Sequence, residues 1–453
     1  MLLRCIALLA VVGAASDHPD VIASSWPPGA RPLGERLAVA NSVAGAAAPG
    51  ACADQNATAP SSPVAAPAMA QDPCAAEPAS AAALAAFAAS AHAARASRVL
   101  VTGGAGFIGS HLVDLLLAEG HEVVVLDDLS TGSVAYLPVD HPRLRVVVGD
   151  VTSAADVRSA LRDPVAGVYH LAAMSKVAPS LLSEAAAALA ETSNVNGTDT
   201  LLGALASGTR VVFAASSTFY GNSPPPAAEA DPFVASSPYA ATKARGEAML
   251  RAADAGGAGP LSTVACRIFM AYGPREPGHG PYGVVTGLFR AARDAGRPLE
   301  VHGGGAQYRD FVHVRDVVRG LHLAFHSAVR GGAPVNLGTG RAVTVAAVAD
   351  LVSSDQRVVG EREMDLRGTL ASTCVAKRRL GFAASVAFED GLEELLAAPR
   401  GGGPGTFSAW GAREWRRGSE RRAELAKALG VPEGADDAAL TLGATRVGRV
   451  RES

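Results

Sequence analysis

A glycine-rich turn lies between an apolar strand and an amphipathic helix near residue 100, and few folds accommodate this order. The apolar run Val99-Leu100-Val101 leads into Gly103-Gly104-Ala105-Gly106-Phe107-Ile108-Gly109. Apolar residues at helical spacing follow and predict a helix from about Phe107 to Ala118. Such a turn lets the backbone approach a pyrophosphate, which then lies at the N-terminus of the helix. We therefore expect a dinucleotide site here, although glycine-rich turns also occur as ordinary tight turns.

Strands and helices alternate after this turn. Further apolar strands are predicted at about Glu122–Leu126, Leu144–Val148, Val165–Leu171 and Arg210–Ala214, with helical stretches between them. This alternation predicts an α/β fold of the Rossmann type, with a doubly wound parallel sheet. Ligands bind such sheets beyond the carboxyl ends of the strands. From about Met270 the pattern loosens, which indicates a smaller C-terminal substrate-binding lobe.

Length and composition exclude several classes of protein. The 453 residues carry 40 Lys and Arg against 43 Asp and Glu, a formal net charge of −3. This balance gives no electrostatic case for nucleic acid as a partner. Five cysteines are too few for a disulfide scaffold. Their spacing suggests no metal site, so we expect no metal.

Composition divides the chain into five parts. Residues 1–16 combine Arg4, a short apolar run and small residues, as in a signal peptide or other targeting segment. A signal-anchor and a disordered start without a sorting role are the alternatives. Residues 17–96 are rich in Ala, Pro and Ser and are interpreted as a disordered linker. We assign 97–270 to the dinucleotide-binding Rossmann domain, 271–397 to the substrate-binding lobe, and 398–453 to a tail of unknown role.

Two acidic residues follow strands at the predicted ligand-binding edge. Asp127 ends the second strand, near the distance from the glycine turn at which an acid binds the adenosine ribose hydroxyls. A carboxylate there repels a 2′-phosphate, so we expect NAD rather than NADP as the cofactor. Asp150 follows the third strand and is placed to reach the adenine edge. For Asp150, capping of the strand end is an equally good interpretation.

A tyrosine and a lysine lie four residues apart in Ser-Pro-Tyr239-Ala-Ala-Thr-Lys243. On a helix this spacing puts both side chains on one face, and a cation beside a phenol lowers its pKa from about 10. A phenolate accepts a proton from a sugar hydroxyl while a nicotinamide accepts the hydride. Alone, such a pair more often lies on a surface helix. Ser216, at the end of the fifth strand, is placed to hydrogen-bond the same substrate oxygen, so the three residues predict an alcohol-oxidising site.

The order of these motifs resembles that of the extended short-chain dehydrogenase/reductases. Within them it is similar to the NAD-dependent nucleotide-sugar epimerase/dehydratase family, especially UDP-glucose 4-epimerase-like members. The resemblance covers about Arg98 to Leu396. It rests on Val101-Thr-Gly-Gly-Ala-Gly-Phe-Ile-Gly109, Val125-Leu-Asp-Asp-Leu-Ser-Thr-Gly132, Gly149-Asp-Val151, His170-Leu-Ala-Ala173, Asn194-Val-Asn-Gly-Thr198, Ser216 with Tyr220-Gly221, Tyr239-x-x-x-Lys243, Tyr272-Gly-Pro-Arg275, Arg309-Asp-Phe-Val-His-Val314 and Asn336-Leu-Gly-Thr-Gly340.

The resemblance implies a role for each matched residue. Tyr239 would remove the proton of the sugar C4 hydroxyl, Lys243 would tune it, and Ser216 would orient the hydroxyl. Thr218 would contact the substrate. Arg309 and Arg362 would clamp the nucleotide diphosphate, with a surface salt bridge as the alternative for each arginine. The residues expected to hold NAD are Gly103, Gly106, Phe107, Ile108, Gly109, Asp127, Asp150, Ala172, Asn194, Tyr239 and Lys243.

Thr218 favours one reaction within the family. Family decarboxylases and dehydratases usually have an acidic residue at this position, whereas Ser217 and Thr218 provide no carboxyl group. The resemblance therefore implies a UDP-hexose 4-epimerase-like isomerase that transiently oxidises C4 to a 4-keto sugar. UDP-glucuronate decarboxylase, or another nucleotide-sugar modifier of this family, is one alternative. A non-catalytic nucleotide-binding regulatory protein is the other alternative. It is motivated by Met270, which stands where the family usually has a substrate-contacting asparagine.

Two further expectations concern assembly and location. The resemblance implies a homodimer, because family members commonly pair through two helices of each subunit. The targeting segment and the Ala/Ser-rich stretch after it predict entry into the secretory pathway or an organelle reached through it, and the sequence does not distinguish a lumen from a plastid.

Overall fold

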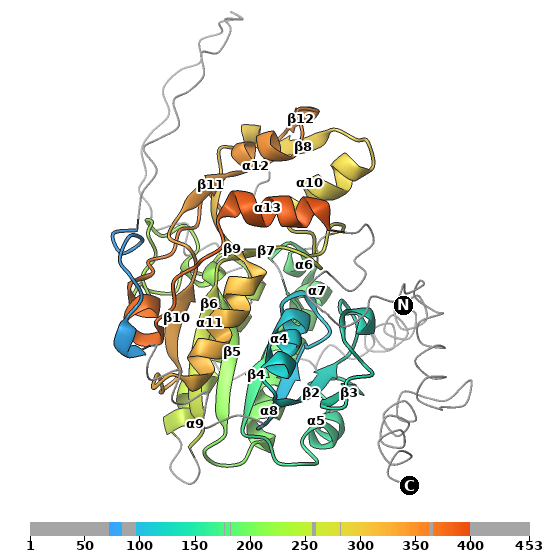
Figure 1. The fold of residues 1–453 in the computed structure, drawn as a ribbon, viewed down its shortest axis with the longest axis vertical. Coiled ribbons are helices and arrows are strands. Elements are labelled where there is room, and N and C mark those ends of the chain that lie inside the picture. The colour runs from blue at the N-terminus through green and yellow to red at the C-terminus, as the bar shows by residue number, and fades with distance from the viewer. Residues whose placement is uncertain are drawn as a thin grey trace, which may run out of the picture. The chain divides into compact units, whose positions relative to one another are not determined.

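The computed structural model describes residues 72–83, 97–175, 177–181, 183–255, 260–280, 282–361 and 366–398. Within these residues, seven parallel strands form the larger sheet in the order β10-β6-β5-β4-β1-β2-β3 (Figure 1). The strands are β1 (Arg98–Thr102), β2 (Glu122–Asp127), β3 (Leu144–Val148), β4 (Gly167–His170), β5 (Arg210–Ser216), β6 (Ser262–Ile268) and β10 (Ala333–Leu337). The predicted α/β fold with a doubly wound parallel sheet is confirmed.

Both faces of this sheet are buried, as strand β1 illustrates. Val99 and Val101 belong to a core that includes Leu112 and Leu116 of α4 (Phe107–Ala118). Leu100 points to the other face and packs in a separate core under α5 (Ala154–Ala160) and α8 (Gly197–Ala204). Because each alternate side chain has a covered face, the strand is apolar at successive positions. The bounds of α4 are those predicted from the spacing of its apolar residues.

Two smaller sheets form the C-terminal region. The first has the order β11-β9-β7, in which β9 (Tyr308–His313) pairs antiparallel with β11 (Ala342–Thr344) and parallel with β7 (Met270–Tyr272). The second joins β8 (Leu299–His302) and β12 (Gln356–Val359). The helices of this region are α10 (Val285–Asp294), α12 (Val345–Val352) and α13 (Phe388–Ala397). The expected smaller C-terminal region is therefore present.

The chain passes between the two regions more than once. After β9, helix α11 (Val314–His326) packs on the larger sheet beside α4, and β10 then pairs with β6 (Figure 1). A single boundary at residue 270 does not describe this path, because Val335 and Leu337 of β10 are buried in the core of the larger sheet. The remaining elements are η2 (Val134–Tyr136), α6 (Val177–Ser180), α7 (Glu184–Glu191), the π-helical η3 (Thr192–Asn196), η4 (Ser217–Tyr220), α9 (Pro238–Ala255), η5 (Gly303–Gly305) and the π-helical η6 (Ala376–Leu380).

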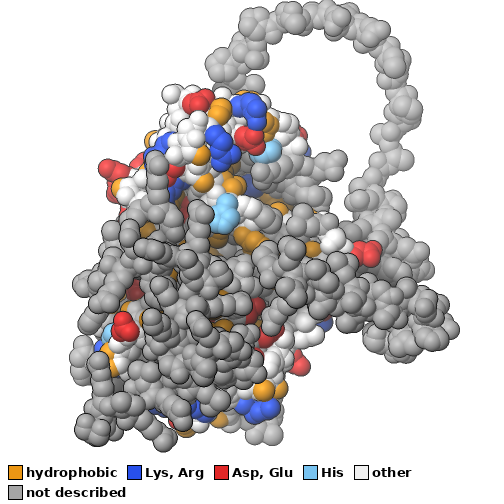
Figure 2. All heavy atoms as spheres, turned by 90° about the vertical axis from the view of Figure 1, so that its right-hand side faces the viewer, with side chains coloured by type: hydrophobic (Ala, Val, Ile, Leu, Met, Phe, Trp, Pro, Cys, Tyr) orange, Lys and Arg blue, Asp and Glu red, His pale blue; other side chains and the backbone are white. Residues whose placement is uncertain are grey.

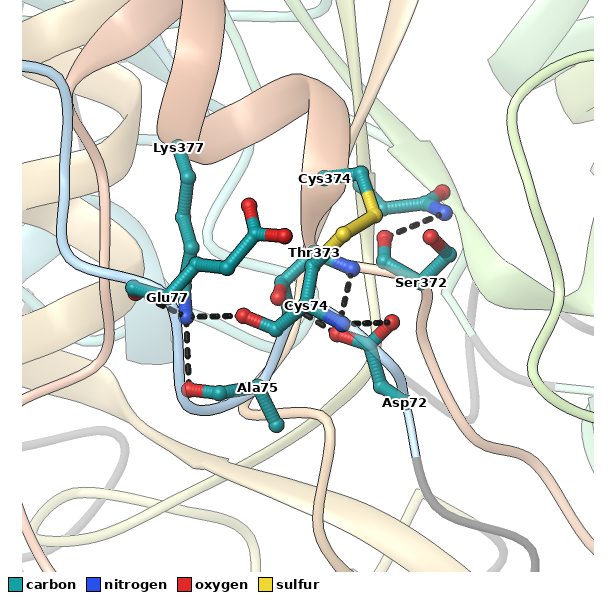
Figure 3. Close-up of a disulfide and its surroundings, with 9 residues drawn as sticks. Asp72, Cys74, Ala75, Glu77, Ser372, Thr373, Cys374 and Lys377 are labelled. Carbon is teal, nitrogen blue, oxygen red and sulfur yellow. Dashed lines mark hydrogen bonds between the residues drawn. A yellow bond between two sulfur atoms is a disulfide. The ribbon is translucent and has the colours of Figure 1, made fainter.

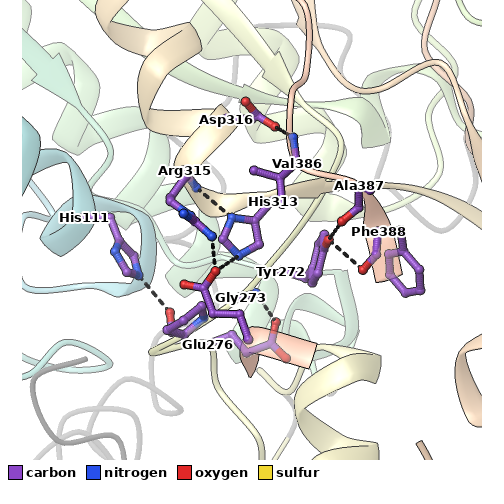
Figure 4. Close-up of polar contacts among 12 residues, drawn as sticks. His111, Tyr272, Gly273, Glu276, His313, Arg315, Asp316, Val386, Ala387 and Phe388 are labelled. Atoms are coloured by element: carbon purple, nitrogen blue, oxygen red, sulfur yellow. Dashed lines mark hydrogen bonds and ion pairs between the residues drawn. The ribbon is translucent and has the colours of Figure 1, made fainter. Parts of the chain in front are cut away.

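A polar cluster joins the two regions beside α4 (Figure 4). Nε2 of His111 lies 2.8 Å from the carbonyl oxygen of Pro274, in the loop after β7. His313, the N-cap of α11, lies 3.9 Å from the carboxylate of Glu394 in α13, which also pairs with Arg315. Burial lowers the pKa of His111 to about 3 and that of His313 to about 4. Both imidazoles are therefore neutral at pH 7, so His111 joins the regions through a hydrogen bond and His313 meets Glu394 as an uncharged group.

An N-terminal segment packs against the C-terminal region. Residues 72–80, which we name the N-terminal strap, are linked to it by a disulfide between Cys74 and Cys374, 300 residues apart (Figure 3). The carboxylate of Asp72 accepts a hydrogen bond from the amide of Thr373 at 2.9 Å. The interpretation of residues 17–96 as one linker misses this contact, because the Ala- and Pro-rich composition carries no sign of a partner so distant in sequence. The expected targeting segment and tail lie outside the described residues.

The surface of the C-terminal region mixes both signs of charge. Figure 2 shows basic and acidic side chains beside one another at the upper end of the molecule. Arg357 and Glu300, an exposed pair on the two strands of the smallest sheet, are an example at 2.5 Å. Such a surface agrees with the small net charge of the whole chain. Among the described residues, none of the helices has the length and apolar character needed to cross a bilayer.

A buried ion pair joins α9 to β6. The Nε and Nη2 atoms of Arg267 donate to the two carboxylate oxygens of Glu247, both at 2.8 Å. The side chains of Arg267 and Glu247 are 3% and 1% exposed. Arg251 also pairs with Glu247, at 3.7 Å, but its side chain is 49% exposed. One carboxylate thus has one buried and one exposed cationic partner.

We expect the substitution Arg267→Ala to lower the free energy of unfolding by about 3–5 kcal/mol, because it leaves the buried Glu247 carboxylate without its buried partner. Arg251→Ala is the matched control and should cost at most about 1 kcal/mol, since an exposed pair contributes little. Urea denaturation followed by circular dichroism measures both values. Equal losses from the two substitutions would contradict the assignment of the stability to the buried pair.

Candidate active site

The glycine turn between β1 and α4 forms a tight backbone cradle. Gly103 has a φ of +71°, and a Cβ atom there would lie 2.7 Å from the amide nitrogen of Ala172. A Cβ on Gly109 would lie 2.1 Å from the carbonyl oxygen of Gly103. Gly106 is the N-cap of α4 and provides no side-chain hydrogen bond to the helix. The helix N-terminus therefore presents its amides and its partial positive charge to the cradle, an arrangement suited to a pyrophosphate.

Asp127 lies beside this cradle at the end of β2. One carboxylate oxygen accepts a hydrogen bond from the amide of Ala105 and the other from the amide of Leu129, both at 2.9 Å. Burial raises the pKa of Asp127 to about 6, and the two backbone hydrogen bonds oppose the rise. Each oxygen keeps a second lone pair for a ligand hydroxyl. The position and the remaining acceptor capacity of Asp127 fit the predicted contact with a ribose.

Asp150 is placed differently from Asp127. Its side chain is exposed, and its Oδ1 accepts hydrogen bonds from the amide and the hydroxyl of Thr152, both at 2.8 Å. The structure thus shows the capping arrangement that the sequence left open, and contact with the adenine stays a prediction. Phe107 and Ile108 begin α4 at the edge of the cradle, where both are half-buried.

The hydroxyl groups of Tyr239 and Ser216 meet at the end of β5. Tyr239 is 9% exposed on α9, and its phenol is hydrogen-bonded to Ser216. The Oγ of Ser216 also accepts a hydrogen bond from Thr218 Oγ1 at 3.0 Å. Lys243, one turn along α9, donates from Nζ to the carbonyl oxygen of Ala214 at 2.7 Å. The structure therefore brings together the three residues predicted to carry the chemistry.

The pKa of Tyr239 differs from the value expected from the sequence. Burial raises the pKa of Tyr239 to about 12, and the hydrogen bond from Ser216 only partly opposes the rise. The predicted lowering of this pKa by Lys243 is wrong for this structure, since the ammonium is directed at Ala214 and burial lowers its own pKa to about 8. Glu247, one turn further along α9, raises the pKa of Lys243. The phenol therefore holds its proton here.

Asn194 supports the helix that carries Tyr239. Its Nδ2 donates to Thr242 Oγ1 at 2.9 Å and to the carbonyl oxygen of Met174 at 3.1 Å. The hydroxyl of Thr242 donates to the carbonyl oxygen of Tyr239 at 2.8 Å. Thr242 was not among the residues predicted from the sequence, where its position three residues after Tyr239 was the available signal. The predicted contact of Asn194 with the cofactor stays a prediction.

His170 is a second residue whose role the sequence did not reveal. Its ring nitrogens contact the hydroxyls of Thr102 and Thr198, at 2.7 and 2.9 Å. Burial lowers the pKa of His170 to about 3, with a smaller contribution from Lys243. The hydroxyl of Thr102 also accepts a hydrogen bond from the amide of Ala172 at 3.2 Å. A neutral His170 thus helps fix the backbone against which the glycine turn packs.

Of the two arginines predicted to bind the diphosphate, the structure describes only Arg309. Arg309 lies on β9 with 9% exposure, and its Nη1 donates to the carbonyl oxygens of Tyr308 and Leu366, at 2.8 and 2.9 Å. These contacts orient the guanidinium but do not test the phosphate role. Arg362 lies outside the described residues.

Comparisons with known proteins agree with this geometry. Residues 99–338 match the model of the NAD dependent epimerase/dehydratase family. A UDP-glucose 4-epimerase of Mycolicibacterium smegmatis is 35% identical over 318 residues, 66% of this chain and 97% of that protein. A UDP-N-acetyl-alpha-D-glucosaminuronate decarboxylase of Bacillus cytotoxicus is 32% identical over 324 residues, 66% of this chain and 96% of that protein. The structure of Thermus thermophilus UDP-glucose 4-epimerase in complex with NAD has a TM-score of 0.60 at 32% identity, covering 66% of this chain and 97% of that one.

This chain belongs to the NAD-dependent epimerase/dehydratase family of extended short-chain dehydrogenase/reductases. The predicted family is thus confirmed, and the protein is a nucleotide-sugar-modifying enzyme of that family. An epimerase and a decarboxylase are similar to it at nearly the same identity, so the family alone does not select the reaction.

The buried ammonium of Lys243 predicts a pH dependence of stability. Because burial lowers its pKa from 10.5 to about 8, the unfolded chain binds more protons than the folded protein between these pH values. The free energy of unfolding of the wild type should therefore rise with pH in this window, relative to that of Lys243→Met, by up to about 3 kcal/mol. Denaturant unfolding of both proteins from about pH 7 to about pH 10.5 gives the difference. A difference independent of pH would contradict the lowered pKa.

Proposed function

We propose that this protein is an NAD-dependent nucleotide-sugar epimerase, resembling the UDP-hexose 4-epimerases. The observation that carries the proposal is the hydrogen-bonded series of three hydroxyls from Thr218, Ser216 and Tyr239, in a turn without a carboxylate. Hydroxyl groups orient an alcohol and exchange its proton, which is what oxidation and reduction at one carbon require. Elimination of water would need an additional acid, and η4 (Ser217–Tyr220) contains none.

The residues around the glycine turn fit NAD as the cofactor. The cradle from Gly103 to Gly109 would hold the pyrophosphate at the start of α4, and Asp127 would accept hydrogen bonds from the adenosine ribose. Asn194 and Lys243 would support the nicotinamide end. When bound, NAD supplies reversible acceptance of a hydride from C4 of the sugar.

The proton is the part of the reaction that this chain handles. Oxidation at C4 removes a hydride from the carbon and a proton from its hydroxyl, and Tyr239 as phenolate accepts that proton while Ser216 orients the oxygen. The resulting 4-keto sugar would rotate within the site. The hydride would then return to the opposite face of C4, and the proton would return to the oxygen. For this cycle the pKa of Tyr239 must fall from about 12. A cation within about 4–6 Å of such a group lowers its pKa by about 1–3, so in the working enzyme the Lys243 ammonium would turn from the carbonyl oxygen of Ala214 toward the phenol.

Decarboxylation of a nucleotide-linked uronate is the second candidate. The similarity to a decarboxylase at 32% identity favours it, and the absence of a carboxyl group at Ser217 and Thr218 speaks against it. The non-catalytic alternative is less favoured, because a binding protein has no need for a buried phenol hydrogen-bonded to Ser216.

The deciding experiment incubates the purified protein with NAD and UDP-glucose and follows UDP-galactose by NMR. Conversion without net formation of NADH supports the epimerase. Release of carbon dioxide from UDP-glucuronate would instead establish the decarboxylase. Bound NAD without turnover of either sugar would favour the non-catalytic alternative.

We expect Tyr239→Phe to lower kcat by about 10²–10⁴-fold, because it removes the group that exchanges the C4 proton. The NAD content should be unchanged, since the glycine cradle is intact. Tyr272→Phe is the control. It also removes a buried phenol, but one that donates to the carbonyl oxygen of Phe388 in the C-terminal region. Steady-state assays of both variants make the comparison, and an undiminished kcat in Tyr239→Phe would exclude the assigned role.

We also propose a homodimer that enters an oxidising compartment. Buried disulfides persist in the secretory pathway and are rare in the cytosol, so the Cys74–Cys374 bond supports a targeting role for residues 1–16. A fluorescent fusion of residues 1–97 tests the location, and a cytosolic signal would refute it.

Light scattering after gel filtration tests the proposed homodimer, and a monomer mass would refute it.

A further inference from the structure

The N-terminal strap is held by a buried lysine. Nζ of Lys377 donates to the carbonyl oxygens of Cys74, Ala75 and Glu77, at 2.5, 2.6 and 2.6 Å (Figure 3). Lys377 is only 4% exposed, and its own carbonyl oxygen accepts a hydrogen bond from the amide of Ser80. One side chain therefore organises most of the strap.

A second anchor fixes the strap to residues just before Lys377. The carboxylate of Asp72 accepts hydrogen bonds from the amide and the hydroxyl of Thr373, at 2.9 and 2.5 Å. The next residue, Cys374, forms the disulfide with Cys74. The polar and the covalent anchors thus act on adjacent residues, Thr373 and Cys374.

The chain leading to this anchor supports Arg309. We name residues 366–374 the buttress segment. The carbonyl oxygen of Leu366 accepts a hydrogen bond from Arg309 at 2.9 Å. The amide of Thr369 donates to the carbonyl oxygen of Tyr308 at 3.2 Å. The buttress segment therefore runs along the strand that carries Arg309 and is fixed to the strap at its far end.

A buried carboxylate connects the same elements from the other side. Asp310, which is fully buried, accepts hydrogen bonds from the amides of Ala371, Thr339 and Gly340, at 3.0, 2.7 and 2.9 Å. Gly340 touches the strap in turn, since a Cβ there would lie 3.0 Å from Cβ of Asp72. The strap, the buttress segment and the residue next to Arg309 thus form one packed unit.

We propose that the Cys74–Cys374 disulfide is a redox-dependent positioning device for Arg309. With the bond formed, the strap holds the buttress segment and keeps the guanidinium in place for the nucleotide sugar. A dithiol reductant gives two electrons and two protons to the bond, which leaves two thiols, and the reductant itself becomes a disulfide. The buttress segment then loosens and affinity for the nucleotide sugar falls. This inference rests on the proposed function in assigning the diphosphate to Arg309.

Metal binding is the alternative to a disulfide at this place in the structure. Asp72, Cys74 and Cys374 place their ligand atoms within 4.8 Å of one another, a spacing that also suits a zinc ion. Zinc would need both sulfurs as thiolates, so the disulfide and the metal exclude each other. Metal content therefore distinguishes the two.

The first test does not depend on the reaction. Digestion of the full-length protein without reductant should give a linked peptide containing Cys74 and Cys374. Treatment with dithiothreitol should increase hydrogen exchange in the buttress segment and leave the glycine turn unchanged. The double variant Cys74→Ser, Cys374→Ser should show the increased exchange without dithiothreitol. Unchanged exchange in the reduced wild type, or one zinc per chain in place of the linked peptide, would overturn the proposal.

The second test separates affinity from turnover. Reduction should raise KM for UDP-glucose about tenfold, equivalent to about 1.4 kcal/mol, with kcat and NAD content unchanged. Cys266→Ala, which removes the buried free cysteine among the described residues, is the matched control and should keep the full response to dithiothreitol. Increased exchange with an unchanged KM would refute the link to Arg309. If UDP-glucose is not a substrate, the proposed function fails, and the exchange test still decides whether the disulfide fixes the buttress segment.

Discussion

The glycine turn rests directly on the backbone that follows β4, and the whole cofactor side of the molecule depends on this contact. A side chain on Gly103 would collide with the amide nitrogen of Ala172, so the two segments meet with nothing between them. Thr102 and His170 hold the facing segment through hydroxyl–imidazole contact. Because the approach is so close, the N-terminus of α4, the end of β4 and Asp127 of β2 converge on one small volume. The groups that meet in this volume are backbone amides and one carboxylate.

Much of this arrangement was predictable from the sequence, because strands buried on both faces have continuous apolar runs that are easily recognised. Strands covered on both sides are apolar at successive positions, and α4 has apolar residues at helical spacing, so the five strands β1 to β5 and helix α4 were predicted within a few residues of their observed bounds. The polar residues that interrupt these runs at strand ends, such as Asp127 and Ser216, were the candidate ligand-binding residues. The structure places both at that edge of the sheet.

What the sequence did not reveal depends on partners far along the chain. The return of β10 to the larger sheet pairs Asn336 with Arg267 of β6, and no local pattern encodes that register. The strap is a similar case, because Asp72 and Lys377 find their partners about 300 residues away. The direction of Lys243 toward Ala214 is a local event, but it follows from the burial of the ammonium rather than from its spacing to Tyr239. The four-residue spacing predicts that Tyr239 and Lys243 lie near each other, whereas their burial determines their pKa values.

The disulfide also changes what the unfolded chain can do. Residues 74–374 form a closed covalent loop, and the residues that match the family model, 99–338, lie entirely within it. In the chain-entropy description, closing a loop of this length disfavours the unfolded ensemble by about 6 kcal/mol. A bond at the edge of the molecule therefore restricts the expansion of the entire enzyme domain. A single backbone cleavage inside the loop would leave both pieces joined as one molecule.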